Sequence, residues 1–232
     1  MFKMEIPAYI LNVVNPRDRN SFVGIILEIR IMDKTENKTY NSSIVSGSLL
    51  MAESRKVADL LLRNADSDQW HHAIVIENIL QKRSPETAKK QGHLIKNRLN
   101  LMDKALWMFV RDGSAEVASQ SLLAAAIKHS RLIGDFLDTV MRQHWQTFTK
   151  KINVKDWNLY LEQCAQINPQ VDTWKTTTRS KLKQIVFRIL AEAKYIDSTR
   201  TCNLIPVSIA PEVKTYLVKN TEDYVLSCME IT

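Results

Sequence analysis

Apolar residues recur at intervals of three to four positions through most of the chain after residue 47, and this spacing predicts amphipathic helices. The segment 48–64 is an example, because Val57, Leu60 and Leu61 fall on one face of a helix. The pattern predicts a mainly α, globular helical protein. Further helices are expected over 67–80, 84–104, 114–145 with a break near Gly134, 155–167, 179–196 after the capping residues Thr176 to Thr178, and 211–220.

The first 31 residues depart from this pattern, since AYILNVV and SFVGIILEIRI are β-prone and flank the turn-like NPRDRN. They are compatible with a hairpin, or with an extension that precedes a natural start at Met32. We therefore divide the chain into an N-terminal extension or short hairpin (1–40), a domain that contains a helix-turn-helix (41–155) and a winged-helix-like C-terminal subdomain (156–232).

The expected helix at 84–104 has a basic side. Ser84 is typical of an N-cap and Pro85 of a first helical turn, because proline lacks the amide hydrogen that has no partner there. At 100° per residue, one side of this helix is apolar, with Ala88, Gly92, Ile95, Leu99 and Met102. The other side carries polar residues that could face phosphates, namely Lys89, Lys90, His93, Lys96, Asn97, Asn100 and Lys104.

The surroundings of this helix favour a binding surface over an ordinary solvated face. Segment 82–104 holds seven of the chain's 32 Lys and Arg against two acidic residues. A helix over 67–80, a short connection at 81–83 and the basic helix have the order of a helix-turn-helix, although helical hairpins share it. A lysine stripe is also common on a face that merely meets solvent, so both interpretations remain open here.

A second basic helix follows Thr176. Leu182, Ile185 and Ile189 lie on its apolar face, and segment 175–194 has six basic residues against one acidic residue. Residues 196–209 can pair as two short strands around a polar turn, and Pro211 opens another helix. This segment has the order of a winged helix, namely a helix, a basic helix, a hairpin and a further helix. The alternative is a helical hairpin with an irregular loop.

Composition narrows the function classes. The net charge of +7 indicates a polyanionic partner. Three isolated cysteines, Cys164, Cys202 and Cys228, support neither a disulfide framework nor a zinc site and fit a reducing cytoplasm. The apolar runs are far shorter than the roughly 20 residues that span a bilayer, and no secretory signal is recognisable.

The sequence gives little indication of a catalytic function. The sequence lacks a phosphate-binding G-x-x-x-x-G-K-[ST], a dinucleotide loop and a G-x-S-x-G elbow. His71 and His72 would point about 100° apart on a helix, unlike a metal-binding pair. The tryptophans Trp107, Trp145, Trp157 and Trp174 could stack on bases, but apolar helical positions favour a core role.

Several extended blocks resemble the BrxA proteins of bacterial BREX (bacteriophage exclusion) defence systems. They are LLMAESRKVADLLL, the Trp70 helix leading into ENILQKRSPETAKK, LIKNRL, QSLLAAAIKHSRLIGDFL, TTTRSKLKQIVFRILAEAKYID and the PEV helix, which together cover roughly residues 42–218. The resemblance implies a helical, DNA-binding protein with helix-turn-helix elements, no known catalytic motif and a role in phage defence. Residues 1–31 lie outside it.

We therefore expect a non-catalytic, cytoplasmic, double-stranded DNA-binding component of a BREX system, without a cofactor or metal and more readily a monomer than an obligate oligomer. Other BREX proteins are further expected partners, and the alternative function is an adaptor that scaffolds a defence complex without touching DNA. The candidate DNA-binding residues are Lys82, Arg83, Lys89, Lys90, Lys96, Asn97, Lys175, Arg179, Lys181, Lys183 and Arg188.

Overall fold

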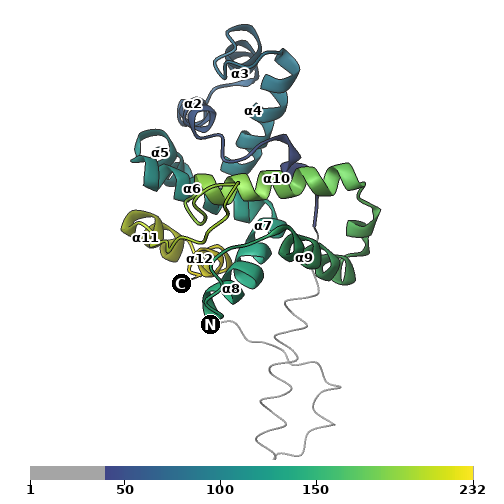
Figure 1. The fold of residues 1–232 in the computed structure, drawn as a ribbon. Helices are drawn as coiled ribbons and strands as arrows, with labels where there is room; N and C mark the ends of the chain where they lie inside the picture. The colour runs from purple at the N-terminus through teal and green to yellow at the C-terminus, as the bar shows by residue number, and fades with distance from the viewer. Residues whose placement is uncertain (1–39, 232) are drawn as a thin grey trace, which may run out of the picture. The chain divides into compact units, whose positions relative to one another are not determined.

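The computed structural model describes residues 40–231, and over this range the chain is built from helices (Figure 1). The predicted mainly α class is confirmed, while the expected hairpin of residues 1–31 lies outside the described residues. The elements, including short 3-10 and π turns labelled η, are η1 (Ser43–Ser46), α2 (Met51–Leu62), α3 (Ser67–His71), η2 (His72–Ile76), α4 (Pro85–Leu99), α5 (Lys104–Asp112), α6 (Ala115–His129), α7 (Arg131–Phe136), η3 (Leu137–Met141), α8 (Arg142–Gln146), α9 (Val154–Ile167), η4 (Pro169–Thr173), α10 (Thr176–Glu192), α11 (Pro211–Lys219) and α12 (Asp223–Met229).

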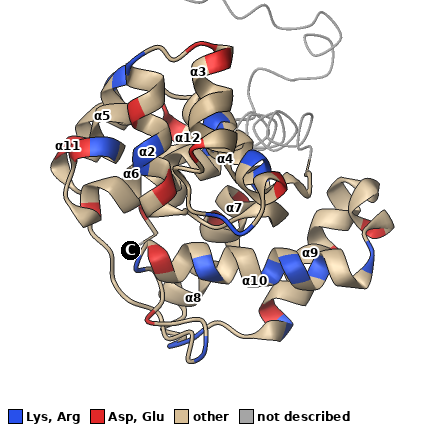
Figure 2. Ribbon diagram, turned by 90° about the horizontal axis from the view of Figure 1, so that it is seen from above, with Lys and Arg blue, Asp and Glu red and all other residues tan. Residues whose placement is uncertain are grey.

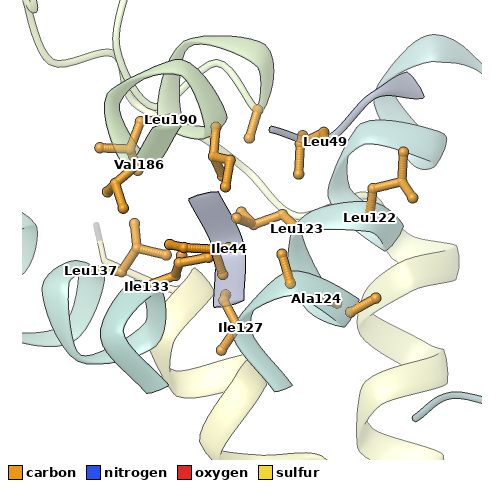
Figure 3. Close-up of a cluster of buried hydrophobic side chains, with 14 of the residues drawn as sticks. Ile44, Leu49, Leu122, Leu123, Ala124, Ile127, Ile133, Leu137, Val186 and Leu190 are labelled. Carbon is orange, nitrogen blue, oxygen red and sulfur yellow. The ribbon is translucent and has the colours of Figure 1, made fainter. Parts of the chain in front are cut away.

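Helix α6 lies at the centre of the core. Every residue from Val117 to Ile127 is buried, and the helix packs against α2, α4, α5, α7, α11 and α12. Figure 3 shows Leu123 and Ile127 of α6 beside Ile133 and Leu137, with residues of α10 closing the cluster. One hydrophobic core therefore takes residues from both sides of position 155, where we divided the chain, and the division into two parts there stays a prediction.

Local sequence explains where several helices begin. The Ser84 hydroxyl accepts a hydrogen bond from the amide of Thr87, and Pro85 is the first residue of α4, as expected. Pro211 likewise opens α11. Asp66 and Asn153 each form a capping box at the start of α3 and α9, where the side chain accepts from free amides of the first turn.

Some expected helix bounds were wrong because tertiary or capping contacts override the periodicity. The helix expected over 84–104 ends at Leu99, since the Asp103 carboxylate accepts hydrogen bonds from the amides of Ala105 and Leu106 and starts α5 instead. Likewise, the helix expected over 67–80 ends at Ile76, and Asn78 adopts a left-handed φ of 49° in a longer connection.

The break expected near Gly134 occurs at Ser130, whose backbone is extended, while Gly134 lies inside α7. Gly134 serves packing instead, because a Cβ atom there would lie 2.3 Å from the hydroxyl oxygen of Tyr224 on α12. Thr176 to Thr178 do not cap α10. They form its first turn, and no side chain caps the helix at Lys175. Helix α12 was not anticipated.

The two short strands expected around the polar turn at 197–203 are not formed as strands within residues 40–231. Two isolated antiparallel bridges occur there instead, joining Ile196 to Leu204 and Lys151 to Asn203. The pairing stops at Ile205, whose amide donates to the carbonyl of Tyr195, because Pro206 has no amide hydrogen to extend it. The winged-helix and helix-turn-helix assignments therefore stay predictions.

Candidate nucleic-acid interface

Helix α4 separates a buried face from a basic one as its periodicity predicted. Ala88, Ile95 and Leu99 are buried in the core, whereas Lys89, Lys90 and the two other polar residues His93 and Asn97 are exposed. The nearest carboxylate to Lys90 is that of Glu86 at 4.0 Å, and both side chains are largely exposed, so this pair does little to neutralise the face. No ion pair involves Lys89 within residues 40–231.

Lys96 occupies a more defined position on the same face. Its ammonium nitrogen lies 4.3 Å from the centroid of the Trp70 ring, and Trp70 belongs to α3. A cation held over an indole face is attracted by the ring's negative π surface while its outer side stays available to an anion. The contact fixes Lys96 beside Asn97 and orients the basic face of α4 relative to α3.

Two candidate cations lie in the connection before α4, and only one of them, Arg83, is available to bind a phosphate. Arg83 is exposed and forms no ion pair in the part of the chain that the structure describes. Lys82 pairs with the carboxylate of Glu53 on α2, both side chains are mostly covered, and its backbone bonds the Asn78 side chain. Lys82 thus anchors the connection to α2 and is a poor phosphate ligand in this arrangement.

Helix α10 carries the second set of candidate residues, and Figure 2 shows basic positions on both α4 and α10. Lys175, Lys181 and Arg188 are exposed and have no acidic partner within the described residues. The guanidinium group of Arg179 instead donates to the carbonyls of Trp174 and Val171 and to the carboxylate of Asp172, at 3.0 to 3.2 Å. Arg179 therefore fastens η4 to α10.

Lys183 lines a groove of about 350 Å³ between α9 and α10. Trp157 and Leu161 form part of its α9 wall, and Glu162 also lines it. The carboxylate of Glu162 lowers the net positive charge of this groove. Within α10, Lys181 and Arg188 are consequently the side chains best placed to meet an external phosphate.

Residues 47–49 link the two basic helices. The guanidinium group of Arg98 on α4 donates to the carbonyl oxygens of Ser48 at 2.5 Å and Gly47 at 3.2 Å. The carboxylate of Glu192 on α10 accepts from the Ser48 hydroxyl and from the Leu49 amide, both at 2.8 Å. Desolvation lowers the pKa of Arg98 to about 10 while Glu192 opposes the shift, so a protonated arginine lies inside the protein at neutral pH.

Arg98 was counted among the basic residues of the segment 82–104, yet it is buried and belongs to the core. The periodicity contains the signal that identifies it, since Arg98 lies nine residues, or about two and a half turns, after Lys89 and therefore on the opposite side of α4. The Lys96–Trp70 contact, by contrast, joins two helices and has no signal in either segment alone.

The histidines and tryptophans considered for metal binding and base stacking have the following positions in residues 40–231. No cluster of three or more metal-binding side chains occurs there, and His71 and His72 are exposed. Trp157 is buried and Trp107, Trp145 and Trp174 pack against the core, which agrees with the core role favoured for them. In the same range, no helix has the length and apolar character needed to cross a membrane.

Comparison with known proteins identifies the family. A family model described as BrxA matches residues 38–221. The chain belongs to the BrxA family. It is 48% identical over 193 residues to a protein of Paramagnetospirillum magneticum (strain ATCC 700264 / AMB-1), named BREX protein BrxA, with 83% of this chain and 97% of the relative covered. A protein of the same name from Escherichia coli O9:H4 (strain HS) is 32% identical over 194 residues, covering 84% of this chain and 91% of the relative.

A solved structure has a similar fold. The crystal structure of an uncharacterized protein from Magnetospirillum magneticum superimposes with a TM-score of 0.79 at 45% sequence identity, covering 84% of this chain and all of that one. The family membership that the sequence blocks indicated is confirmed. The BrxA match starts at residue 38, so both basic helices lie inside it and residues 1–37 lie outside.

Proposed function

We propose that this protein is a non-catalytic, double-stranded DNA-binding component of a BREX bacteriophage defence system. The BREX part rests on membership of the BrxA family and on the names of the relatives. The DNA-binding part rests on one observation, namely the exposed cations of α4 and α10 that have no close carboxylate partner among residues 40–231. Unneutralised lysines fixed on a rigid helix are the usual ligands of backbone phosphates.

Helix α4 is the main contact element in this proposal. Arg83, Lys89, Lys90 and Lys96 would bind phosphates, and Asn97 has an exposed amide that can bond either a phosphate or a base edge. Helix α10 adds Lys181, Lys183 and Arg188, and Lys175 lies at its N-cap. Lys82 and Arg179 would act indirectly, by holding the ends of the two basic segments in place.

We expect binding to duplex DNA to weaken steeply as salt rises. If about six phosphates are neutralised, a plot of log affinity against log salt concentration has a slope near −5, because each contact releases condensed counterions. Fluorescence anisotropy with a labelled duplex at several salt concentrations measures this slope. Tight binding with a flat slope contradicts the electrostatic account, and absence of binding at low salt favours an adaptor that never touches DNA.

We also expect no turnover of DNA or nucleotide. Incubation of the protein with supercoiled plasmid, Mg²⁺ and ATP should leave the plasmid topology and the ATP concentration unchanged, because no phosphate-binding loop or metal-binding cluster is found within residues 40–231. Agarose gels and a phosphate-release assay measure the two substrates. Cleavage or ATP hydrolysis that persists through further purification would show that the protein is an enzyme.

A further inference from the structure

Phe148, between α8 and α9, combines an exposed aromatic ring with a left-handed backbone. Its side chain is 90% exposed, the highest value among the exposed large hydrophobic residues in the described range. Its backbone has a φ of 54°, in the left-handed region that costs a non-glycine residue about 1 kcal/mol or more. The exposed ring buries little apolar surface, whereas the left-handed backbone lets the amides of Phe148 and Thr149 close the C-terminus of α8. The ring therefore adds little to the stability of the fold and is available for contact with a partner.

The loop that carries Phe148 is fixed by backbone hydrogen bonds on both sides of the ring. On the α8 side, the amides of Phe148 and Thr149 donate to the carbonyls of Trp145 and His144 at 3.1 and 2.8 Å. After it, the Lys150 carbonyl accepts from the Leu204 amide at 2.9 Å, and the Ile152 amide donates to the carbonyl of Cys202 at 3.1 Å. The exposed ring is therefore presented by an ordered loop.

Basic residues occur in the loop of Phe148 and in the turn that bridges to this loop. Lys150 and Lys151 follow Phe148 directly and are exposed, and Lys151 bridges to Asn203 next to the turn that carries the exposed Arg200. Figure 2 shows basic positions in the loops beside α8. Within residues 40–231 none of these three cations forms an ion pair. The Asp197 carboxylate accepts hydrogen bonds from Asn203 and Thr201 inside the turn and so holds the turn rigid.

We propose that Phe148, Lys150, Lys151 and Arg200 form a second contact with duplex DNA, in which the Phe148 ring wedges between two base pairs and the cations bind the flanking phosphates. This proposal rests on the DNA-binding function proposed above and assigns a role to residues that the charge pattern of the helices did not include. Proteins that unstack a base step from the minor groove combine an apolar wedge with basic side chains in the same way. The positive charge favours a nucleic-acid occupant over an apolar protein surface.

The decisive variant is Phe148→Asn. Asparagine adopts the left-handed backbone more readily than phenylalanine, and the exposed ring contributes no buried area, so the variant should fold with an unchanged or higher thermal midpoint. Its affinity for duplex DNA should fall about 5- to 100-fold, the range associated with loss of one aromatic–base stacking contact. The salt slope should stay the same, because no charge is removed.

Unstacking can be observed directly. A set of short duplexes, each with one 2-aminopurine at a different position, should show a rise in fluorescence when the parent protein binds, because this base is quenched by stacking. Phe148→Asn should abolish the rise even at saturating protein. Lys150→Ala combined with Lys151→Ala should instead reduce the magnitude of the salt slope by about 2.

Val218→Asn is the matched control, since Val218 is also more than half exposed but lies at the end of α11. It should change neither affinity nor fluorescence. If the parent binds DNA and Phe148→Asn binds equally well with the same fluorescence, the wedge is wrong and the proposed function stands. If the parent protein itself does not bind duplex DNA at low salt, both are wrong.

Discussion

Replacing Lys89, Lys90 and Lys96 together by alanine is expected to weaken duplex DNA binding on the order of 100-fold at about 0.1 M salt. Lys89 and Lys90 are exposed on α4 and Lys96 is partly exposed on the same face, and each lost phosphate contact removes the entropy gained when a condensed counterion is released. The salt slope should fall in magnitude from about 5 to between about 2 and 3. Anisotropy titrations of the parent and the variant at several salt concentrations measure both effects.

The folded state of this triple variant should be nearly as stable as the parent. Alanine is a good helix former, and the largest loss is the contact between the partly exposed Lys96 and Trp70, worth about 1 kcal/mol. Leu99→Ala, on the buried face of the same helix, should reduce the free energy of unfolding by about 2–5 kcal/mol through lost apolar contact and the cavity left behind. Urea unfolding distinguishes the two faces.

A charge-matched control separates a local contact from a general loss of positive charge. Lys128, Lys214 and Lys219 lie on α6 and α11, and the first two already pair with Glu222 and Glu230. Replacing these three by alanine should change DNA affinity far less than the α4 set. If both triple variants bind as tightly as the parent at low salt, the face of α4 is an ordinary solvated surface.

The second basic helix permits an independent check of the same idea. Replacing Lys181, Lys183 and Arg188 by alanine should also weaken binding if α4 and α10 contact one duplex, and combining both sets should weaken it further. An α10 variant with parental affinity would confine the interface to α4 and its neighbours.

Arg98→Met is expected to reduce the free energy of unfolding by about 3–5 kcal/mol. The substitution removes the donors to the carbonyls of Gly47 and Ser48 and leaves Glu192 without its nearby opposite charge, while methionine supplies only apolar contact. Because residues 47–49 also bind Glu192, the link between α4 and α10 should loosen. Urea unfolding followed by circular dichroism measures the change in unfolding free energy.

Arg188→Met is the matched control, since Arg188 lies exposed on α10. It should leave unfolding unchanged and weaken DNA binding, whereas Arg98→Met should mainly destabilise the fold. An Arg98→Met variant as stable as the parent would mean that methionine packing offsets the lost polar contacts.

The local sequence determined the helical class, the starts of α4 and α11 and the division of α4 into a buried and a basic face. Ser84 and Pro85 act on amides within their own helical turn. The 3.6-residue repeat alone places the lysines of α4 on a different face from Ala88, Ile95 and Leu99. The family blocks were likewise readable from the chain, and they are confirmed by the BrxA match over residues 38–221.

Only the tertiary structure decided which cations remain available. Lys82 and Arg179 have the same charge as their neighbours, but Glu53 on another helix and the carbonyls of η4 engage them. The exposure of Phe148 was equally unpredictable, because a loop residue has no periodicity from which to infer burial. The physical reason is common to these cases: capping and helical periodicity act within a few residues, whereas ion pairing and burial depend on segments that only the folded chain brings together.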